Sequence, residues 1–361
     1  MEEIKEEIGI YILNYNGINW LKKNLNNIIK NSGTIQIIII DNNSHDNSVD
    51  YIEKHFPKVE IYTHKTNYGF SKGYNNVLLK ENRFKYYILL NNDVKVTENW
   101  INPMLDLFNR GQAKIVQPKI LSAIKEKQFD YAGAAGGFID IMGIPFCRGR
   151  IFNTLELDCN QYNDSVDIFW ASGCCFMIES KLFKKLNGLD EDLFMHQEEI
   201  DLCWRGQKEN IKILYCPQST IYHYGGGTLS TQNPLKSFYN HRNNLLILIK
   251  NLPIYLLMII IPVRIIIDYS LIISNLISGL LYLVFISPLY LNKIYDTNIQ
   301  YGLKKIKKGF LILFAHISVI FLLKKFIKKR APIYPTRVHL RSIIFDYYIM
   351  RIKQFSKLKK F

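Results

Sequence analysis

Short apolar runs alternate with segments of helical period along the first ninety or so residues. The runs are rich in β-branched residues and end at polar clusters, which is typical of buried strands. Between them, apolar residues recur at helical spacing. The expected strands are Ile8–Asn14, Ile35–Ile40, Val59–Thr63 and Tyr86–Leu90, and the expected helices are Trp20–Lys30, Ser48–His55 and Lys72–Glu81.

This alternation with short loops predicts an α/β fold, with a Rossmann-like, mostly parallel sheet and helices on both faces. Ligands of such sheets bind at the carboxyl ends of the strands. The polar clusters at residues 14–17, 41–48 and 91–93 each follow a predicted strand. We therefore expect them to converge on one site.

The pattern becomes irregular after Pro118. Residues 130–150 are rich in Gly and Ala, which indicates either a flexible loop or short antiparallel strands. Further expected elements are a strand at Phe169–Ile178, a helix at 180–187, and two short strands at Ile211–Cys216 and Thr220–His223.

Three apolar stretches follow from Leu252 onward. Leu252–Ile267 is apolar apart from Arg264, and Leu271–Tyr290 has no formal charge over twenty residues, long enough for a helix to cross a bilayer. Gly309–Leu323 is shorter. On a helix, Arg264 and Asp268 could pair. We expect a catalytic domain over residues 1–250 and a helical, membrane-associated region over residues 251–361.

Charge divides the chain in the same way. The net charge is +15, yet residues 231–361 hold 21 of the 46 Lys and Arg and only three of the 31 acids, so residues 1–230 are close to neutral. A basic tail fits nucleic acid or an anionic membrane, and the apolar stretches favour the membrane, so no nucleic acid is expected. The basic residues beside the stretches are Lys304, Lys305, Lys307, Lys308, Lys324, Lys325, Lys328, Lys329 and Arg330.

This distribution disfavours a single crossing, because Lys and Arg gather on the cytoplasmic side of membranes. We expect a hairpin or interfacial attachment to the cell membrane, with the catalytic domain on the cytoplasmic side. The six Cys residues form no CxxC pair and no zinc-ligand spacing, and the first residues are acidic without an apolar segment. Both observations fit reduced thiols in the cytosol.

Individual residues suggest chemistry but leave alternatives. Asp41, at a strand end, can accept hydrogen bonds from a nucleobase or ribose, or cap a loop. Asp93 can hold a divalent cation that binds a diphosphate, or belong to a turn. Six acids lie between Asp190 and Asp201, interleaved with large apolar side chains. Crowded, partly buried carboxylates suit a general base, whereas a capped amphipathic helix is the structural alternative.

Taken in order, these segments resemble the family 2 glycosyltransferases, in particular the rhamnosyltransferase-like branch, over roughly residues 8–250. Each motif is weak alone, and the order makes the signal specific. The motifs are Leu13-Asn14-Tyr15-Asn16-Gly17, Asp41-Asn42-Asn43-Ser44, Asn67-Tyr68-Gly69-Phe70, Leu90-Asn91-Asn92-Asp93, Trp170-Ala171-Ser172-Gly173, the acidic run, His223 with its glycines, and Arg242-Asn243.

The resemblance implies a GT-A fold and a metal-dependent enzyme that inverts configuration. Asp41 would read the nucleobase with Asn14 beside it. Asp93 would hold Mg²⁺ or Mn²⁺, and His223 is a candidate for binding the metal or the diphosphate. Trp170 would line the sugar pocket. The further donor-binding candidates are Asn16, Asn43, Asn67, Gly69, Asn75, Asn91, Arg205 and Arg242.

The acidic run would supply the catalytic residues. Glu199 matches the position of the base, although the family often has Asp there, and Glu198 is the alternative. Asp201 and Arg205 would brace the run. The metal motif reads Asn-Asn-Asp rather than Asp-x-Asp, so Asp93 is its only acid.

The expected reaction moves a sugar from a nucleoside-diphosphate sugar to a hydroxyl of a saccharide or lipid-linked acceptor, in cell-surface polysaccharide or glycolipid synthesis. A sugar-nucleotide pyrophosphorylase is one alternative, but residues 14–20 lack its Gly-rich, basic loop. A non-catalytic membrane or nucleic-acid-binding protein is another. The intact Asp41, Asp93 and Glu199 argue against it.

Overall fold

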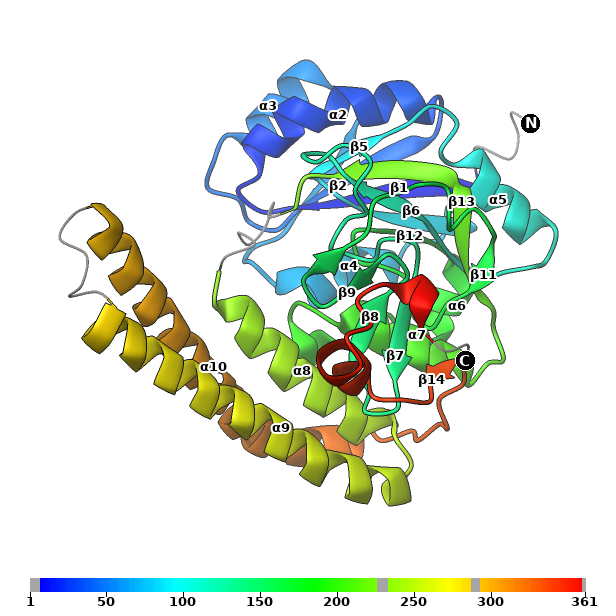
Figure 1. Ribbon diagram of the computed structural model, residues 1–361. Helices are drawn as coiled ribbons and strands as arrows, with labels where there is room; N and C mark the ends of the chain where they lie inside the picture. Colours follow the sequence, from blue (N-terminus) through cyan, green and yellow to red (C-terminus); the bar gives the residue numbers. More distant parts are fainter. Residues whose placement is uncertain (1–6, 226–232, 287–292, 359–361) are drawn as a thin grey trace. The chain divides into compact units, whose positions relative to one another are not determined.

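The computed structural model describes residues 7–225, 233–286 and 293–358, which fall into two compact units (Figure 1). The first unit comprises Met1–Ser230 and Pro335–Phe361, and the second comprises Thr231–Tyr334. This division differs from the predicted one at residue 250. The second unit begins earlier, and the last residues of the chain return to the first unit.

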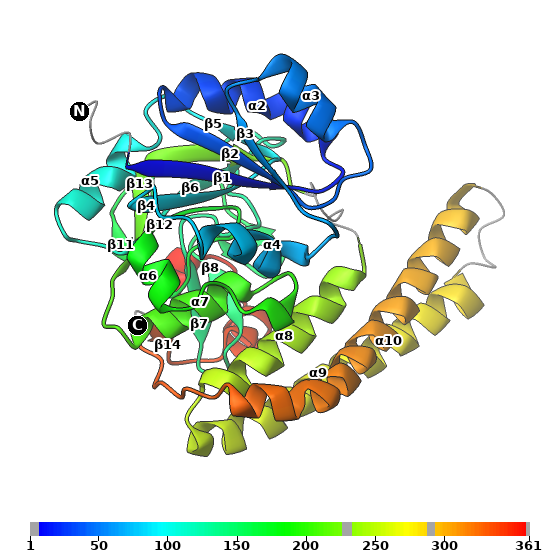
Figure 2. The same cartoon turned by 180° about the vertical axis from the view of Figure 1, so that it is seen from behind.

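A nine-stranded sheet forms the centre of the first unit (Figures 1 and 2). Four neighbouring strands are parallel, as predicted: β3 (Glu60–Thr63), β2 (Gln36–Asp41), β1 (Ile8–Asn14) and β4 (Tyr86–Asn91). The sheet continues through β12 (Cys175–Glu179), β6 (Ile115–Ser122), β13 (Ile213–His223) and β11 (Val166–Asp167), with β5 (Val94–Val96) paired to β13.

The sheet is mixed rather than mostly parallel, because β12 is antiparallel to both β4 and β6. The chain enters β12 from the carboxyl edge of β4, where the Asn91 amide donates to the Cys174 carbonyl over 2.9 Å. It therefore has to run back along β4. Of the predicted strand Phe169–Ile178, only the part from Cys175 onward forms a strand. The two short strands predicted at Ile211–Cys216 and Thr220–His223 form one bulged strand, β13.

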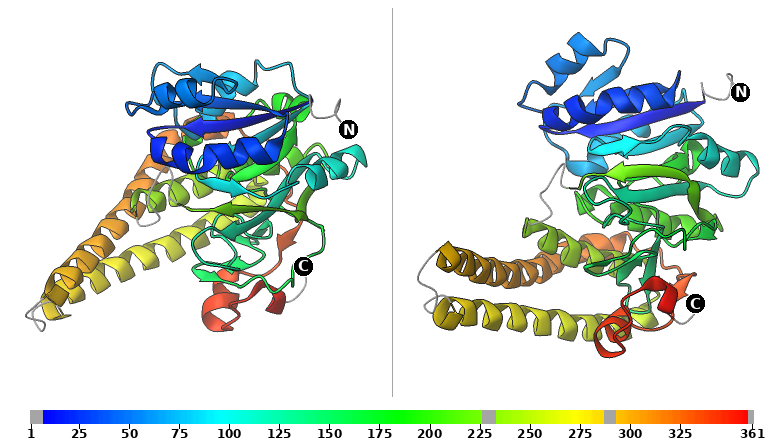
Figure 3. Two further views of the ribbon diagram at one scale, coloured as in Figure 1. Left: turned by 90° about the horizontal axis from the view of Figure 1, so that it is seen from above. Right: turned by 45° about the horizontal axis from the view of Figure 1, so that its top comes forward.

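Helices cover both faces of this sheet, as the alternating pattern predicts (Figure 3). Ile8, Ile10 and Ile12 of β1 belong to a buried cluster with the apolar residues of α2, whereas Tyr11 contacts the opposite layer through Tyr87. One layer holds α2 (Ile18–Ser32), α3 (Ser48–His55) and α5 (Asn102–Asn109), and the other holds α4 (Gly69–Leu78), α6 (Ser180–Lys185) and α7 (Glu198–Gln207).

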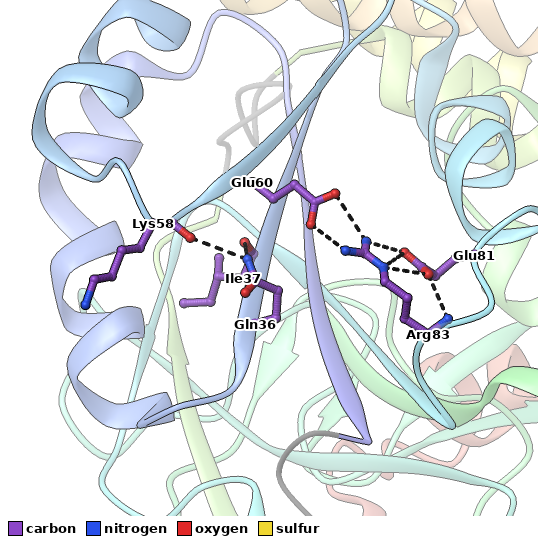
Figure 4. A network of polar contacts seen from close by, with 6 residues as sticks. All are labelled: Gln36, Ile37, Lys58, Glu60, Glu81 and Arg83. Carbon is purple, nitrogen blue, oxygen red and sulfur yellow. Dashed lines mark hydrogen bonds and ion pairs between the residues drawn. The ribbon is translucent and has the colours of Figure 1, made fainter.

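An arginine clamp fastens edge strand β3 to the segment after α4 (Figure 4). Arg83 donates from Nη1 to Glu60 over 2.9 Å and from Nη2 to Glu81 over 2.6 Å. Burial alone would raise the pKa of Glu81, but the hydrogen bonds and charge of Arg83 lower it to about 2. The side chain of Gln36 donates to the Lys58 carbonyl, which joins β2 to the start of β3.

A second, smaller sheet forms from the Gly- and Ala-rich region. Of the two predicted alternatives, the structure shows short antiparallel strands. The C-terminal segment adds a parallel strand, and Phe355 packs on Phe138 with ring centroids 5.1 Å apart. The order is β10 (Thr154–Leu155), β9 (Arg150–Ile151), β8 (Pro145–Cys147), β7 (Gly137–Asp140) and β14 (Val338–His339).

The second unit consists of α8 (Leu235–Asn251), α9 (Ile254–Leu281), a short π-helix (Tyr282–Ile286) and α10 (Lys293–Lys328). The first two predicted apolar stretches join into α9, which continues through Pro262. Residues 287–290 of the second stretch lie outside the described residues. Two segments, Ile254–Val284 and Ile299–Lys328, are long and apolar enough to cross a membrane, and only 22% and 28% of their most apolar windows are buried.

We expect Phe355→Ala to destabilise the first unit by about 1–3 kcal/mol, because it empties a contact on the smaller sheet. Phe345→Ala is the matched control. That ring is 45% exposed, so the change should stay within about 0.5 kcal/mol. Urea unfolding followed by tryptophan fluorescence is the measurement, since Trp20, Trp100, Trp170 and Trp204 all belong to the first unit. Equal losses of unfolding free energy in both variants would show that the C-terminal segment does not pack on the smaller sheet through Phe355.

Candidate functional site

Hydrogen bonds join the carboxyl ends of β1, β2 and β4. Asn14 is paired in register with Asp41, and its Nδ2 donates to Asp41 Oδ1 over 3.1 Å. Asn92 Nδ2 donates to Asn14 Oδ1 over 3.0 Å. Ser44 donates from its hydroxyl to Asp41 Oδ1 over 2.6 Å and from its amide to Oδ2 over 2.9 Å. The predicted convergence of these strand ends is therefore present.

Close backbone packing supports this network. A Cβ on Gly17 would lie 2.3 Å from both Asn14 Oδ1 and Asn92 Nδ2, so only glycine fits there. Asn16 accepts the His45 amide over 2.7 Å and lies in a left-handed conformation, with φ of 50°. Asn43 is left-handed as well, and the Asn91 side chain is half-buried at the end of β4.

Asn67 and Gly69 form a turn that holds the start of α4. Asn67 Oδ1 accepts the Gly69 amide over 2.9 Å and Asn42 Nδ2 over 2.9 Å. Gly69 has φ of 75°, and a Cβ there would approach the Phe194 ring to 2.5 Å. The Phe70 amide donates to the Phe194 carbonyl over 2.8 Å. This turn therefore fixes the acidic run against α4.

Asn75 occupies a bracing position. Its Nδ2 donates to the Leu189 carbonyl over 2.8 Å, and its Oδ1 accepts the Leu189 amide over 3.0 Å. Both ends of the amide are thus engaged by Leu189, the residue just before the acidic run. The predicted contact of Asn75 with the donor stays a prediction.

The acidic run turns sharply before α7. Phe194, His196 and Gln197 all have positive φ, between 64° and 70°, which is costly for residues with side chains. Such conformations persist only where the surroundings impose them. They place Glu198 and Glu199 in the first turn of α7.

The two glutamates have different environments. Glu198 is 3% exposed, and its Oε2 has no hydrogen-bond partner. Glu199 is half-buried, and a Cβ on Gly173 would lie 3.7 Å from its carboxyl carbon and 3.6 Å from the Phe70 ring. The Glu199 carboxyl therefore lies between the Trp-Ala-Ser-Gly segment and the start of α4.

Burial controls the acidity of both groups. It raises the pKa of Glu199 to about 7. It also raises the pKa of Glu198 well above its ordinary value, with an added contribution from the charge of Glu199. Burial thus favours the neutral acid at Glu198, whereas Glu199 titrates in the range that suits a general base.

Asp201 and Arg205 form an internal brace. Arg205 Nε donates to the fully buried Asp201 over 2.7 Å. Its Nη2 donates to the Gly188 carbonyl over 2.7 Å, and Nη1 donates to the Leu186 carbonyl. These contacts tie α7 to the segment before the acidic run.

Trp170 is 5% exposed, and its ring packs on Gly137 of the smaller sheet, where a Cβ would approach the indole to 2.1 Å. Its Nε1 donates to the Phe138 carbonyl over 3.0 Å. Its role in the sugar pocket stays a prediction.

Arg242 lies in the second unit, in α8, where it donates to Asn243 and its guanidinium lies over Phe238. Gly226 and Gly227, which follow His223 and Gly225, lie outside the described residues.

Asp93 and His223 lie together. His223 pairs in register with Val94, so its Nε2 is 3.2 Å from Asp93 Oδ1, and its Nδ1 is 2.8 Å from Asp130 Oδ1. All three side chains are buried. A metal-ligating histidine characteristically donates its other ring N–H to a carboxylate, so this arrangement fits a divalent cation held by Asp93 and His223.

Sequence reasoning missed several residues of the site. Ser44 and Asn92 lie inside recognised motifs, and their roles follow only from the register of neighbouring strands. Asp130 gave no local signal, because it is a single acid at the start of a Gly- and Ala-rich stretch.

Comparison with known proteins agrees with this geometry. Residues 10–186 match the model of glycosyl transferase family 2. The low-salt glycan biosynthesis hexosyltransferase Agl10 of Haloferax volcanii is 24% identical over 222 residues, which cover 60% of this chain and 67% of that protein. The N-acetylglucosaminyl-diphospho-decaprenol L-rhamnosyltransferase of Mycobacterium tuberculosis is 22% identical over 205 residues, covering 53% and 66%.

The chain thus spans about two thirds of the length of these curated relatives. Among solved structures, GalNAc-T7 with UDP, GalNAc and Mn²⁺ aligns with a TM-score of 0.54 at 15% identity, over 88% of this chain and 57% of that one. This likeness shows the GT-A fold. The sequence match and the fold together show that residues 10–186 belong to a glycosyltransferase family 2 domain, and the curated relatives support its rhamnosyltransferase-like branch.

Proposed function

We propose that this protein transfers a sugar, with inversion, from a nucleoside-diphosphate sugar to an acceptor hydroxyl. The observation that carries the proposal is Glu199. It is a half-buried carboxyl with a pKa of about 7, and it faces Gly173, whose neighbour Cys174 accepts the Asn91 amide at the carboxyl end of β4. The network of Asn14 and Asp41 reaches the same strand end through Asn92. A proton acceptor and a polar nucleotide-binding edge are the two parts that such a transfer needs.

Asp41 is the proposed nucleoside contact. Its carboxylate is oriented by Asn14 and Ser44, so it can accept hydrogen bonds from a ribose or base without reorganising. The solved structure of GalNAc-T7 contains UDP, which supports a nucleoside-diphosphate donor for this chain as well.

Glu199 is the proposed base. It removes the proton from the acceptor hydroxyl, whose oxygen then attacks the anomeric carbon from the face opposite the diphosphate, so configuration inverts. Glu198 is unsuited to this role, because it is buried and its burial favours the neutral acid. The helix dipole at the start of α7 stabilises Glu199 in its charged form.

Asp93 and His223 are the proposed ligands of a divalent cation, Mg²⁺ or Mn²⁺. When bound, the cation would neutralise charge on the leaving diphosphate. No cluster of three or more His, Cys, Asp or Glu side chains suited to a metal occurs within residues 7–225, 233–286 and 293–358. Oxygens of the donor and water would therefore complete the coordination, as is usual for Mg²⁺.

The second unit is the proposed membrane attachment, because its polarity is inverted relative to a soluble domain. Large apolar side chains point outward, such as Ile266 at 66% and Phe321 at 82% exposure. Two charged side chains of α9, Arg264 and Asp268, are buried, and Asp268 lies 3.2 Å from His241 Nδ1 and 3.0 Å from His316 Nε2. Ionisable residues in lipid-facing helices pair in this way, inside the bundle.

The arrangement of α9 and α10 is a hairpin. The end of α10 returns to the start of α9, where Arg330 Nη2 donates to the Leu252 carbonyl over 2.7 Å. The two helices approach closely at Gly279 and Gly302, as small residues permit in membranes. On α10, only Gly309–Leu323 separates two Lys clusters, about 22 Å of helix against the roughly 30 Å of a hydrocarbon core. We therefore propose that the hairpin inserts into the cytoplasmic leaflet. The proposed acceptor is a saccharide or a lipid-linked molecule.

A panel of nucleotide sugars tests the reaction. We expect one of them to release its nucleoside diphosphate in the presence of a divalent cation. Glu199→Gln should slow that release by about two to four orders of magnitude, as for loss of a general base. Glu198→Gln is the matched control, because it mimics the neutral acid and should change the rate little. If Glu198→Gln slows release strongly and Glu199→Gln slows it little, then Glu198 is the base. If no donor releases its nucleoside diphosphate, the proposed transferase activity is wrong.

The pH dependence provides a second test. Since Glu199 must be ionised to act, kcat/KM should rise with pH through an apparent pKa near 7 and fall about tenfold per unit below it. The folded pKa exceeds the unfolded one, so wild-type stability declines as pH rises from about 4.5 through 7. Glu199→Gln should therefore unfold at a higher urea concentration than wild type at pH 8, and at a similar concentration at pH 4. A stability difference that does not depend on pH would refute the raised pKa.

Membrane attachment is testable with the full chain. Wild type should require detergent for release from membranes. The double substitution Ile266→Glu with Phe321→Glu should shift it toward the soluble fraction, because each places a charge on the outward apolar face. Ile124→Glu with Leu157→Glu is the control, since both sites are exposed in the first unit. Wild type that stays soluble at low salt without detergent would contradict attachment, and release by high salt would indicate surface binding instead.

A further inference from the structure

The His223 imidazole lies between two buried carboxylates, one at each ring nitrogen. Asp93 faces Nε2 at 3.2 Å, and Asp130 faces Nδ1 at 2.8 Å. The proposed function uses Asp93 and His223 but gives Asp130 no role. Asp130 is 8% exposed and 93 residues distant from His223 in the sequence, so the fold has to bring the two together.

Asp130 is itself held in place before any ligand arrives. Its amide donates to the Ile120 carbonyl over 3.0 Å, and its Oδ1 also accepts the Ala132 amide over 2.8 Å. The Ala132 carbonyl in turn accepts the Ser172 hydroxyl over 2.8 Å. The backbone of Asp130 is thus fixed to β6, and its carboxylate is held by Ala132, which is bound in turn to the Trp-Ala-Ser-Gly segment.

A carboxylate opposite one ring nitrogen decides which nitrogen carries the proton of a neutral imidazole. When a cation binds at Nε2 beside Asp93, it displaces any proton there, and the remaining proton of the neutral ring lies on Nδ1, where Asp130 accepts it. We propose that Asp130 is a positioning residue that sets the tautomer and ring orientation of His223, so that Nε2 is presented to a divalent cation. This proposal rests on the proposed function, because it assumes the cation site at Asp93 and His223.

The small number of protein ligands makes this orientation matter. With one carboxylate and one imidazole as protein ligands, each contributes a large share of the affinity for the cation. A ring with its proton on Nε2 could not bind the cation there, and Asp93 would be the remaining proposed ligand. Loss of a carboxylate that orients a metal-bound histidine typically lowers metal affinity by about 10- to 100-fold.

Binding of Mn²⁺ to the purified full-length protein without donor, followed by electron paramagnetic resonance of free Mn²⁺, tests this directly. Asp130→Ala should lower the affinity by about 10- to 100-fold. Asp130→Asn should lower it less, because the amide oxygen still accepts from His223 Nδ1 and from Ala132 but carries no charge. Asp164→Asn is the matched control. Its side chain is 62% exposed and pairs with Arg148, so affinity should not change.

A second readout separates positioning from loop support. In ¹⁵N spectra of histidine-labelled protein with Mg²⁺, the His223 signal, assigned with His223→Asn, should show a protonated Nδ1 in wild type and a changed tautomer ratio in Asp130→Ala. Wild-type Mn²⁺ affinity and wild-type ¹⁵N shifts in Asp130→Ala would overturn the inference. If Asp93→Ala binds Mn²⁺ as well as wild type does, the proposed cation site is wrong instead, and the ¹⁵N shifts alone then decide whether Asp130 sets the tautomer.

Discussion

The amide of Asn14 joins the ends of three strands, and the geometry of the candidate site depends on that junction. Its nitrogen donates to Asp41 of β2, and its oxygen accepts from Asn92, which follows β4. A primary amide can donate from its nitrogen and accept at its oxygen at the same time. Asp41 and Asp93 are therefore placed at a common edge by the sheet itself rather than by flexible loops.

The acidic run shows how the proposed base, Glu199, is held in place against the energetic cost of its position. Burying a carboxyl disfavours its charged form, and the positive φ angles of Phe194, His196 and Gln197 add backbone strain. The brace from Arg205 to Asp201 and the turn at Gly69 hold the run from both sides. The resulting pKa near 7 for Glu199 is useful to catalysis and unfavourable for stability, which is the usual trade-off at active sites.

Local patterns predicted the parallel half of the sheet well, because short β-branched runs such as Ile37–Ile40 bury their apolar side chains best as strands covered on both faces. They predicted the smaller sheet only as one of two alternatives. The direction of β12 and the continuation of α9 through Pro262 depend on tertiary contacts that no window of sequence contains. Asp130 was missed for the same reason, since its partner His223 lies far along the chain.

The two units solve opposite solvation problems with similar chemistry. In the first, polar side chains meet at an edge of a sheet whose faces are covered by apolar helices. In the second, Asp268 is enclosed by His241 and His316 while the apolar side chains face outward. An outward-facing apolar surface of this kind is unfavourable in water, which is the physical reason for proposing that the second unit attaches to a bilayer. On that proposal, an acceptor carried on a lipid would share a surface with the enzyme, and its effective concentration would rise without any further contact in the catalytic domain.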